Sequence, residues 1–197
     1  MSYQLGAWTY FFCQFHALLI AILICNQEHT LGMWKHLNSL PTSKSKQALA
    51  KHITGALNMF YAHVTLFIFT LISIAILRLV RHDAHLESPL SLILIRDLSA
   101  MFLRCYFASL VSVVIMIFVS SRFRSVGPPV FFYIFGFSLA NVGKITAAPF
   151  LPWSIPILWY HSLSSLPWKH WWLLPWTIWI LIGLILHTIM SERKPFF

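Results

Sequence analysis

His82 and His85 are three residues apart, a spacing that places two imidazoles on one face of a helix. Asp83 and Glu87 lie beside them, and imidazole and carboxylate groups are common ligands of transition metals. One hypothesis is therefore a membrane-embedded enzyme or metal-handling protein. The cluster lacks a clear third ligand position, however, and we predict no metal site.

Other catalytic chemistry is scarce along the chain. It contains no Gly-x-x-x-x-Gly-Lys-Ser/Thr nucleotide loop, no Gly-x-Ser-x-Gly and no His-Glu-x-x-His. Its five acidic residues form no close carboxylate pair within an apolar run, so general acid–base catalysis has few candidates. Cys13, Cys25 and Cys105 lack the Cys-x-x-Cys spacing of a zinc site or a redox pair. We predict no catalytic residues, no enzyme activity and no bound cofactor.

The composition is that of a protein whose main solvent is lipid. Of 197 residues, 58% are hydrophobic and 10% are charged, against about 25% charged residues in soluble domains. This leaves too little polar surface for a water-soluble globule. The net charge of +9 is not arranged as a basic patch interleaved with aromatic residues. It indicates the positive-inside bias of a membrane protein and not a nucleic-acid partner.

The apolar runs predict a single all-α membrane domain over residues 1–197, a polytopic bundle of about five transmembrane helices. The predicted spans are residues 5–25, 56–80, 98–120, 130–148 and 171–190. The first lacks the basic leader and cleavage site of a signal peptide, so we expect it to be retained. It carries Gln14 and His16, which are either functional groups or hydrogen-bonded packing groups at membrane depth.

Residues 26–55 separate the first two spans and form the longest stretch without a membrane-length apolar core. We expect a helix over residues 28–38, a break at Pro41, and a second helix that runs from Lys46 into the next span. Ser43 or Ser45 can cap the second helix. The pattern is typical of a docking element at the membrane surface. An ordinary basic loop that anchors a hairpin is the alternative.

The distribution of lysine and arginine predicts that this element is cytoplasmic. One side of the membrane carries eight basic residues and the other carries three, which places residues 26–55 and the C-terminus inside and the N-terminus outside. The eight are Lys35, Lys44, Lys46, Lys51, Arg122, Arg124, Arg193 and Lys194, and the three are Arg81, Arg96 and Lys169.

Small residues recur along the fourth predicted span and favour close helix packing. At these positions another helix backbone can approach closely, either from a second subunit or from the same chain. The residues are Gly136, Ala140, Gly143 and Ala147.

Residues 149–170 are rich in proline and tryptophan, so continuous helix is not expected there. We predict a broken extracellular hairpin. Trp153 is among the residues that fit an aromatic belt at the membrane interface.

Several short motifs of residues 26–55 are similar to one family. Glu28 is followed by Gly-Met-Trp-Lys from Gly32, Leu-Pro-Thr-Ser-Lys from Leu40, and Ala50-Lys51. This ordered set resembles the cytoplasmic stretch of type-2 ABC transporter permeases, in the branch associated with lantibiotic or bacteriocin export and self-immunity.

Two later pieces agree with that family in order and spacing. Ser-Ser-Arg-Phe-Arg-Ser from Ser120 resembles the basic turn after the family's fourth span. Asn-Val-Gly from Asn141, followed by Leu-Pro-Trp-Ser-Ile-Pro from Leu151, resembles its glycine-bearing span and the exit from it. The family has six spans and a cytoplasmic N-terminus. The segment with the first span is expected to be missing here, which accounts for five spans and an external N-terminus.

The resemblance implies a multi-pass permease of a bacterial plasma membrane that forms a homo- or heterodimer in the lipid bilayer. A separate cytoplasmic subunit would bind ATP and drive transport. The residues that match the ATPase-coupling stretch are Glu28, Trp34, Lys35, Pro41, Lys44 and Lys51. The cargo implied is a hydrophobic or amphipathic peptide antibiotic. The alternative is a membrane immunity or assembly protein that does not transport.

Overall fold

The computed structural model describes residues 11–39, 41–80, 92–142, 151–155 and 173–193. Within these residues the regular elements are helices, and no strand occurs. The helices are α2 (Cys13–Thr30), α3 (Met33–Ser39), α4 (Lys44–Val80), α5 (Leu92–Ser120), α6 (Gly127–Val142) and α8 (Leu173–Arg193). The predicted all-α class is confirmed.

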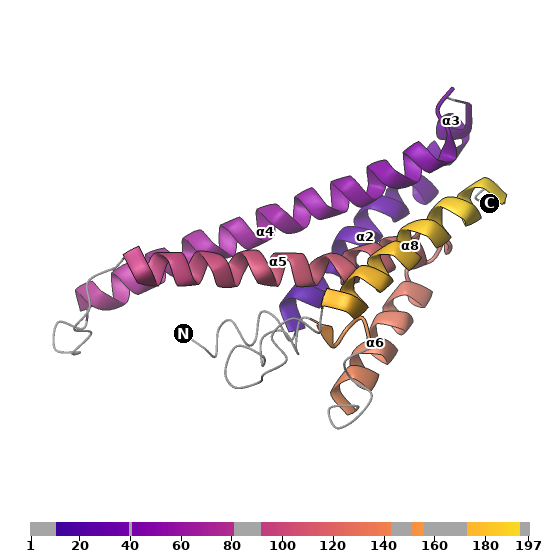
Figure 1. Cartoon of the computed structure of the whole chain (residues 1–197). Helices are drawn as coiled ribbons and strands as arrows, with labels where there is room; N and C mark the ends of the chain where they lie inside the picture. The colour runs from indigo at the N-terminus through magenta and orange to yellow at the C-terminus, as the bar shows by residue number, and fades with distance from the viewer. Residues whose placement is uncertain (1–10, 40, 81–91, 143–150, 156–172, 194–197) are drawn as a thin grey trace.

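Helix α5 is the centre of the bundle and packs against α2, α4, α6 and α8. Its residues 111–117 are all buried. In Figure 1, α4 and α5 lie side by side and together extend beyond the other helices. The short helix α3 lies at the opposite end of the bundle, and the C-terminal end of α8 lies toward that same end.

A stripe of small side chains allows α2 to approach α5 closely. Cys13, Ala17, Ala21 and Cys25 recur at every fourth position of α2, and all four are buried. At one end of the stripe the Cys25 thiol donates to the backbone carbonyl of Ile117 on α5, with 3.8 Å between Sγ and O. In a bilayer, where apolar burial alone does not drive association, such close packing holds helices together.

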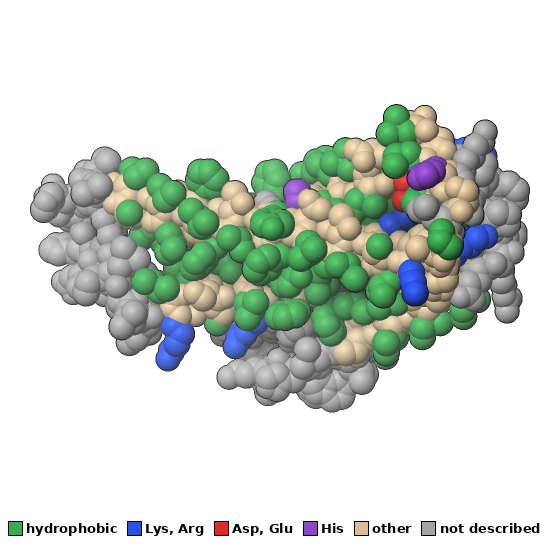
Figure 2. All heavy atoms as spheres, turned by 90° about the horizontal axis from the view of Figure 1, so that it is seen from above, with side chains coloured by type: hydrophobic (Ala, Val, Ile, Leu, Met, Phe, Trp, Pro, Cys, Tyr) green, Lys and Arg blue, Asp and Glu red, His purple; other side chains and the backbone are tan. Residues whose placement is uncertain are grey.

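The outer surface of the bundle suits a lipid environment. Helix α4 over Lys44–Ile76 and α5 over Ile95–Ser120 are long and apolar enough to cross a membrane, and Gly127–Leu139 and Pro175–Ser191 are shorter apolar helices. Hydrophobic side chains cover most of the face seen in Figure 2; several charged and histidine side chains lie toward the end that carries α3, and two basic side chains lie toward the other end. The molecule is a helical membrane bundle.

Helix boundaries differ from the sequence prediction around α5 and α6. Helix α5 begins at Leu92, so residues 92–97 belong to it and not to the predicted connector. Pro128 and Pro129, expected to end a helix, instead lie in the first turn of α6. A missing backbone N–H costs nothing in a first turn, because the first four donors of a helix have no partner within it.

The place of Trp153 in an aromatic belt stays a prediction, but its side chain is only 7% exposed and so packs within the protein and does not face lipid. Its ring lies against Gly136 of α6 and meets Phe132 edge-to-face, with 5.2 Å between ring centroids. Gln14 Nε2 of α2 donates to the Trp153 carbonyl, so this polar residue within the first predicted span is a hydrogen-bonded packing group. The indole fills the space that glycine leaves open. Residues 156–170 of the predicted hairpin lie outside the described part of the chain.

Candidate functional site

The chain bends sharply between α2 and α3. Helix α2 continues through Glu28 to Thr30, so the predicted helix over residues 28–38 is divided by a turn at Gly32. The Leu31 N–H donates to the Gln27 carbonyl over 3.1 Å, and Gly32 has φ of 62°. This left-handed conformation after a helix end is one that glycine adopts readily. Nothing lies within 4 Å of a Cβ placed on Gly32.

Replacing Gly32 by alanine is expected to lower the free energy of unfolding by about 1 kcal/mol, the cost of a left-handed conformation for a residue with Cβ. Thermal unfolding of the purified protein in detergent measures it. The matched control is Gly127→Ala, where the added Cβ also meets nothing within 4 Å and φ is not positive. Equal effects of the two changes would contradict the backbone explanation.

Helix α3 is held against the start of α4 across the predicted break at Pro41. Helix α3 ends at Ser39 and α4 begins at Lys44, so the break is confirmed. Gln47 Nε2 of α4 donates to the Leu37 carbonyl of α3 over 2.8 Å and to Thr42 Oγ1 over 3.2 Å. Ser43 is the residue that caps α4, because its Oγ accepts from the Lys46 N–H over 3.4 Å.

Glu28 and Lys51 form an ion pair that ties the end of α2 to the beginning of α4. Their side chains retain 20% and 11% of their exposure, so the pair is largely shielded from solvent. Two residues that family resemblance alone had associated are therefore direct partners. Screening by salt is weaker for such a pair than for one on the surface.

The other predicted coupling residues are only partly described. Pro41 is exposed in the break, and Lys44 is half-buried as the first residue of α4. Trp34 and Lys35 belong to α3, but their side chains lie outside the described part of the structure. The structure thus brings the predicted stretch together as one bent element at one end of the bundle.

A histidine pair next to this element was not predicted. His52 Nε2 on α4 and His187 Nδ1 on α8 share a hydrogen bond of 2.8 Å, and both residues are buried. One ring must donate and the other must accept, which requires at least one neutral imidazole. In the sequence these are two histidines among several polar residues of their helices, separated by 135 positions, and no local pattern pairs them.

The surroundings of the ion pair are cationic. Burial lowers the pKa of His29, the positive charges of Lys51 and Arg124 lower it further, and Glu28 opposes them. Arg122, whose pKa is lowered by burial, donates from Nη1 to the Met190 carbonyl of α8 over 3.4 Å. Helices α2, α4 and α8 and the turn after α5 all meet here.

The predicted small-residue face of α6 is only partly described. The surface of α6 at Gly136 is already covered by Trp153 of the same chain. A Cβ placed on Gly136 would lie 2.7 Å from three atoms of the Trp153 indole. The side chain of Ala140 and residues Gly143 and Ala147 lie outside the described part. For Ala140, Gly143 and Ala147, the use of this face in helix packing stays a prediction.

The predicted metal candidates also fall outside what the structure describes. His82 and His85 lie in residues 81–91. Among the described residues, no group of three or more potential ligands is close enough to hold a metal ion.

These observations describe an apolar helical membrane bundle that presents a bent, braced and charged element at one end. Residues 1–141 match the family model described as ABC-2 family transporter protein. The chain belongs to this family, and is thus a membrane permease of an ABC transporter that works with a separate ATP-binding subunit. Neither the curated proteins nor the solved structures contain a match.

Proposed function

We propose that this permease exports, or confers immunity to, a hydrophobic or amphipathic lantibiotic-like peptide across a bacterial plasma membrane. The bent element around Glu28 and Lys51 would receive the ATP-binding subunit on the cytoplasmic side. The observation that carries this proposal is the bracing of α3: an isolated basic loop would need neither the Gln47 contacts nor the ion pair.

The bracing suits the transmission of force. A push on α3 would reach α4 through Gln47, α2 through the Glu28–Lys51 pair, and α8 through the His52–His187 hydrogen bond. Helices joined in this way move as rigid bodies instead of absorbing the displacement locally.

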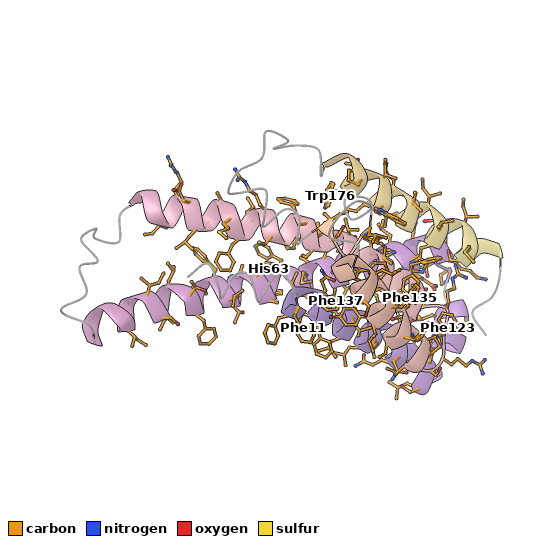
Figure 3. All side chains as sticks on the ribbon, turned by 90° about the horizontal axis from the view of Figure 1, so that it is seen from below. Phe11, His63, Phe123, Phe135, Phe137 and Trp176 are labelled. Atoms are coloured by element: carbon orange, nitrogen blue, oxygen red, sulfur yellow. The ribbon has the colours of Figure 1, made fainter. Side chains whose placement is uncertain are left out.

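An aromatic surface between α2 and α6 supports an apolar cargo. Phe11, just before α2, stacks on Phe15 at a centroid distance of 5.8 Å and meets Phe137 of α6 at 6.0 Å. Phe11 and Phe137 lie close together in Figure 3. Aromatic rings offer large apolar contact area and suit the side chains of an amphipathic peptide.

A different face of α6 is our candidate for contact with a second permease, identical or related. Phe131 and Phe135 of α6 stack on each other at 6.1 Å, and both are exposed.

Co-purification with a candidate ATP-binding subunit expressed in the same cells tests the proposal. Met33 and Lys46 are exposed on the bent element. The combined change Met33→Asp and Lys46→Glu is expected to lower the amount of co-purified ATPase roughly tenfold or more, as loss of central interface contacts does. Resistance of the cells to the peptide should fall with it.

Asp97→Asn is the matched control, because Asp97 is exposed on α5 far from the bent element. It should change neither readout.

Absence of any ATPase in the unaltered preparation would instead favour an immunity or assembly protein. Labelling of Lys44 or Lys46 by a membrane-impermeant amine reagent on intact cells would contradict the cytoplasmic placement.

A further inference from the structure

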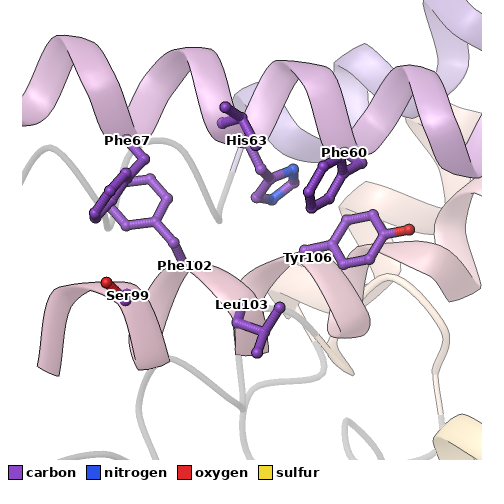
Figure 4. Close-up of a pocket in the computed structure, with 8 residues that line it drawn as sticks. Phe60, His63, Phe67, Ser99, Phe102, Leu103 and Tyr106 are labelled. Carbon is purple, nitrogen blue, oxygen red and sulfur yellow. The ribbon is translucent and has the colours of Figure 1, made fainter. Parts of the chain in front are cut away.

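Hollows on the described surface of the bundle differ in what their polar groups do. The larger cleft, of about 140 Å³ between α4 and α5, is lined mainly by aromatic rings (Figure 4). The hydroxyl of its Ser99 is satisfied within its own helix, because it donates to the Ile95 carbonyl over 2.7 Å. A smaller hollow of about 10 Å³ lies between α2 and the turn that joins α5 to α6. Its polar wall residues are Asn26, Ser120 and Ser125.

Ser120, in the wall of the smaller hollow, is a buried hydroxyl that still has a hydrogen bond to make. It is 3% exposed, and its Oγ makes no hydrogen bond within the described part of the chain. The adjacent Ser121 is also buried, but its Oγ donates to the Phe118 carbonyl over 2.8 Å. A buried hydroxyl without a partner is costly, and the hollow has room for one oxygen atom. Ser120 therefore indicates a polar ligand atom at this place.

The charges around the smaller hollow favour an anion. Arg124 lies in the turn between two residues of the wall. Its positive charge acts on His29, which is about one helical turn along α2 from the wall residue Asn26. Charge acts over several ångströms, so this holds whatever else the guanidinium contacts. The negative charge of Glu28, which also acts on His29, is balanced by Lys51.

The N-terminus of α6 adds to this positive field. Helix α6 begins directly after Val126, another wall residue, and a helix N-terminus is equivalent to roughly half a positive charge. Pro128 and Pro129 have no N–H to donate, so most hydrogen bonds to an anion have to come from side chains. The two hydroxyls and the amide of the polar wall residues can supply them.

The place of the hollow in the bundle indicates where an anion comes from. The turn lies at the end of the bundle where α8 ends, because its Arg122 donates to the Met190 carbonyl, and Figure 3 shows Phe123 toward that end. Phe123 and Val126 line the hollow and are exposed. Apolar side chains beside an anion site suit an amphiphile at a membrane surface. Basic pockets between helices at such a surface bind lipid headgroups.

We propose that the smaller hollow receives one oxygen of a phosphate group, and that this phosphate is the headgroup of an anionic phospholipid in the leaflet on the α3 side. Ser120 donates to the oxygen, and Asn26 and Ser125 offer further donors from the same wall. The rest of the headgroup lies in the field of Arg124 and α6. The bound lipid thus joins the end of α2 to the turn that leads into α6. This site depends on the membrane location of the chain and not on its cargo or its ATPase.

Binding of phosphate-bearing probes to the purified full-length protein tests the site. Native mass spectrometry in detergent measures bound phosphatidylglycerol and phosphatidylcholine, and thermal unfolding in inorganic phosphate, against chloride at equal ionic strength, tests the free ion. We expect phosphatidylglycerol to bind more tightly than phosphatidylcholine. Ser120→Ala should weaken phosphatidylglycerol binding roughly tenfold, equivalent to about 1.4 kcal/mol, because a hydrogen bond to a charged group is lost. Stabilisation by inorganic phosphate without a preference between the lipids would overturn the lipid as the source of the phosphate.

Ser121→Ala is the matched control, because this neighbouring serine is also buried but is bonded to the Phe118 carbonyl. It should lower the unfolding temperature and leave lipid binding unchanged. Ser120→Ala should do the reverse in lipid-free detergent, where its hydroxyl contributes no hydrogen bond. Arg124→Gln should weaken lipid binding about threefold, the size of one solvent-exposed ionic contact, and Arg124→Lys should retain it. Equal lipid binding by Ser120→Ala, Ser121→Ala and the unaltered protein would overturn the site.

Discussion

Trp153→Ala is expected to lower the free energy of unfolding by about 3–5 kcal/mol, the usual cost of removing a large buried aromatic side chain. The Trp153 ring is buried between α6 and the core, and its backbone carbonyl accepts from Gln14 of α2. Without the indole, Phe132 and Gly136 lose a packing surface that no neighbouring side chain replaces. Unfolding titrations in mixed detergent micelles measure the change.

Gly136→Leu should destabilise the same contact from the other side. The added side chain meets three atoms of a rigid ring at 2.7 Å, and such overpacking costs about 1–3 kcal/mol or more. The double variant Gly136→Leu with Trp153→Ala lets the leucine occupy the space that the indole leaves. We therefore expect it to be more stable than the sum of the single changes predicts, by about 1–3 kcal/mol.

Gly127→Leu on the same helix is the control, because a Cβ placed on Gly127 meets nothing within 4 Å. It should cost little. Strict additivity of the two changes at positions 136 and 153 would show that the glycine and the indole do not pack against each other in the membrane.

Local chemistry predicted the helices and the break between α3 and α4 well. Apolar runs of membrane length can form little other than helix, because the backbone must satisfy its own hydrogen bonds in lipid. Proline stops a helix and serine caps the next, so Pro41 and Ser43 marked the break correctly. The turn at Gly32 was missed because a single glycine within a short motif gives no sign of its φ angle.

Packing was harder to predict than the helices. Tryptophan is enriched at membrane interfaces, and composition could not show that Gly136 opens a slot for Trp153. The small-residue spacing that drew attention to α6 also occurs in α2, from Cys13 to Cys25, where the structure uses it against α5. That signal was present in the sequence and applying the same spacing rule to α2 would have found it.

The braces of the candidate site join positions that are far apart in the chain. Glu28 and Lys51 are separated by 23 residues, and His52 and His187 by 135. Helical periodicity relates side chains three or four positions apart, so it carries no information about either pair. Family resemblance associated Glu28 with Lys51 but did not identify them as partners, and it gave nothing on the histidines.

Reversing either charge of the Glu28–Lys51 pair is expected to cost about 2 kcal/mol of unfolding free energy, a value between those of surface pairs and fully buried pairs. Glu28→Lys places two cations together near Arg124, and Lys51→Glu places two carboxylates together. The exchanged pair, Glu28→Lys with Lys51→Glu, should recover more than half of the loss. Recovery should be incomplete because the surrounding charge is positive.

The matched control is the Arg96–Asp97 pair on α5, whose side chains are 75% and 63% exposed. Reversing Asp97 to lysine should cost less than about 1 kcal/mol, because an exposed pair of this kind contributes little. An equal loss at both pairs would show that the partial burial of the Glu28–Lys51 pair has no energetic consequence.

ATPase co-purification by the same variants separates two roles for the pair. If Glu28 and Lys51 position the bent element, each single reversal weakens ATPase binding and the exchanged pair restores it together with stability. If either residue contacts the ATPase directly, the exchanged pair restores stability alone, because the partner then meets the wrong charge. Their mutual contact and low exposure favour the positioning role, and we expect both readouts to recover together.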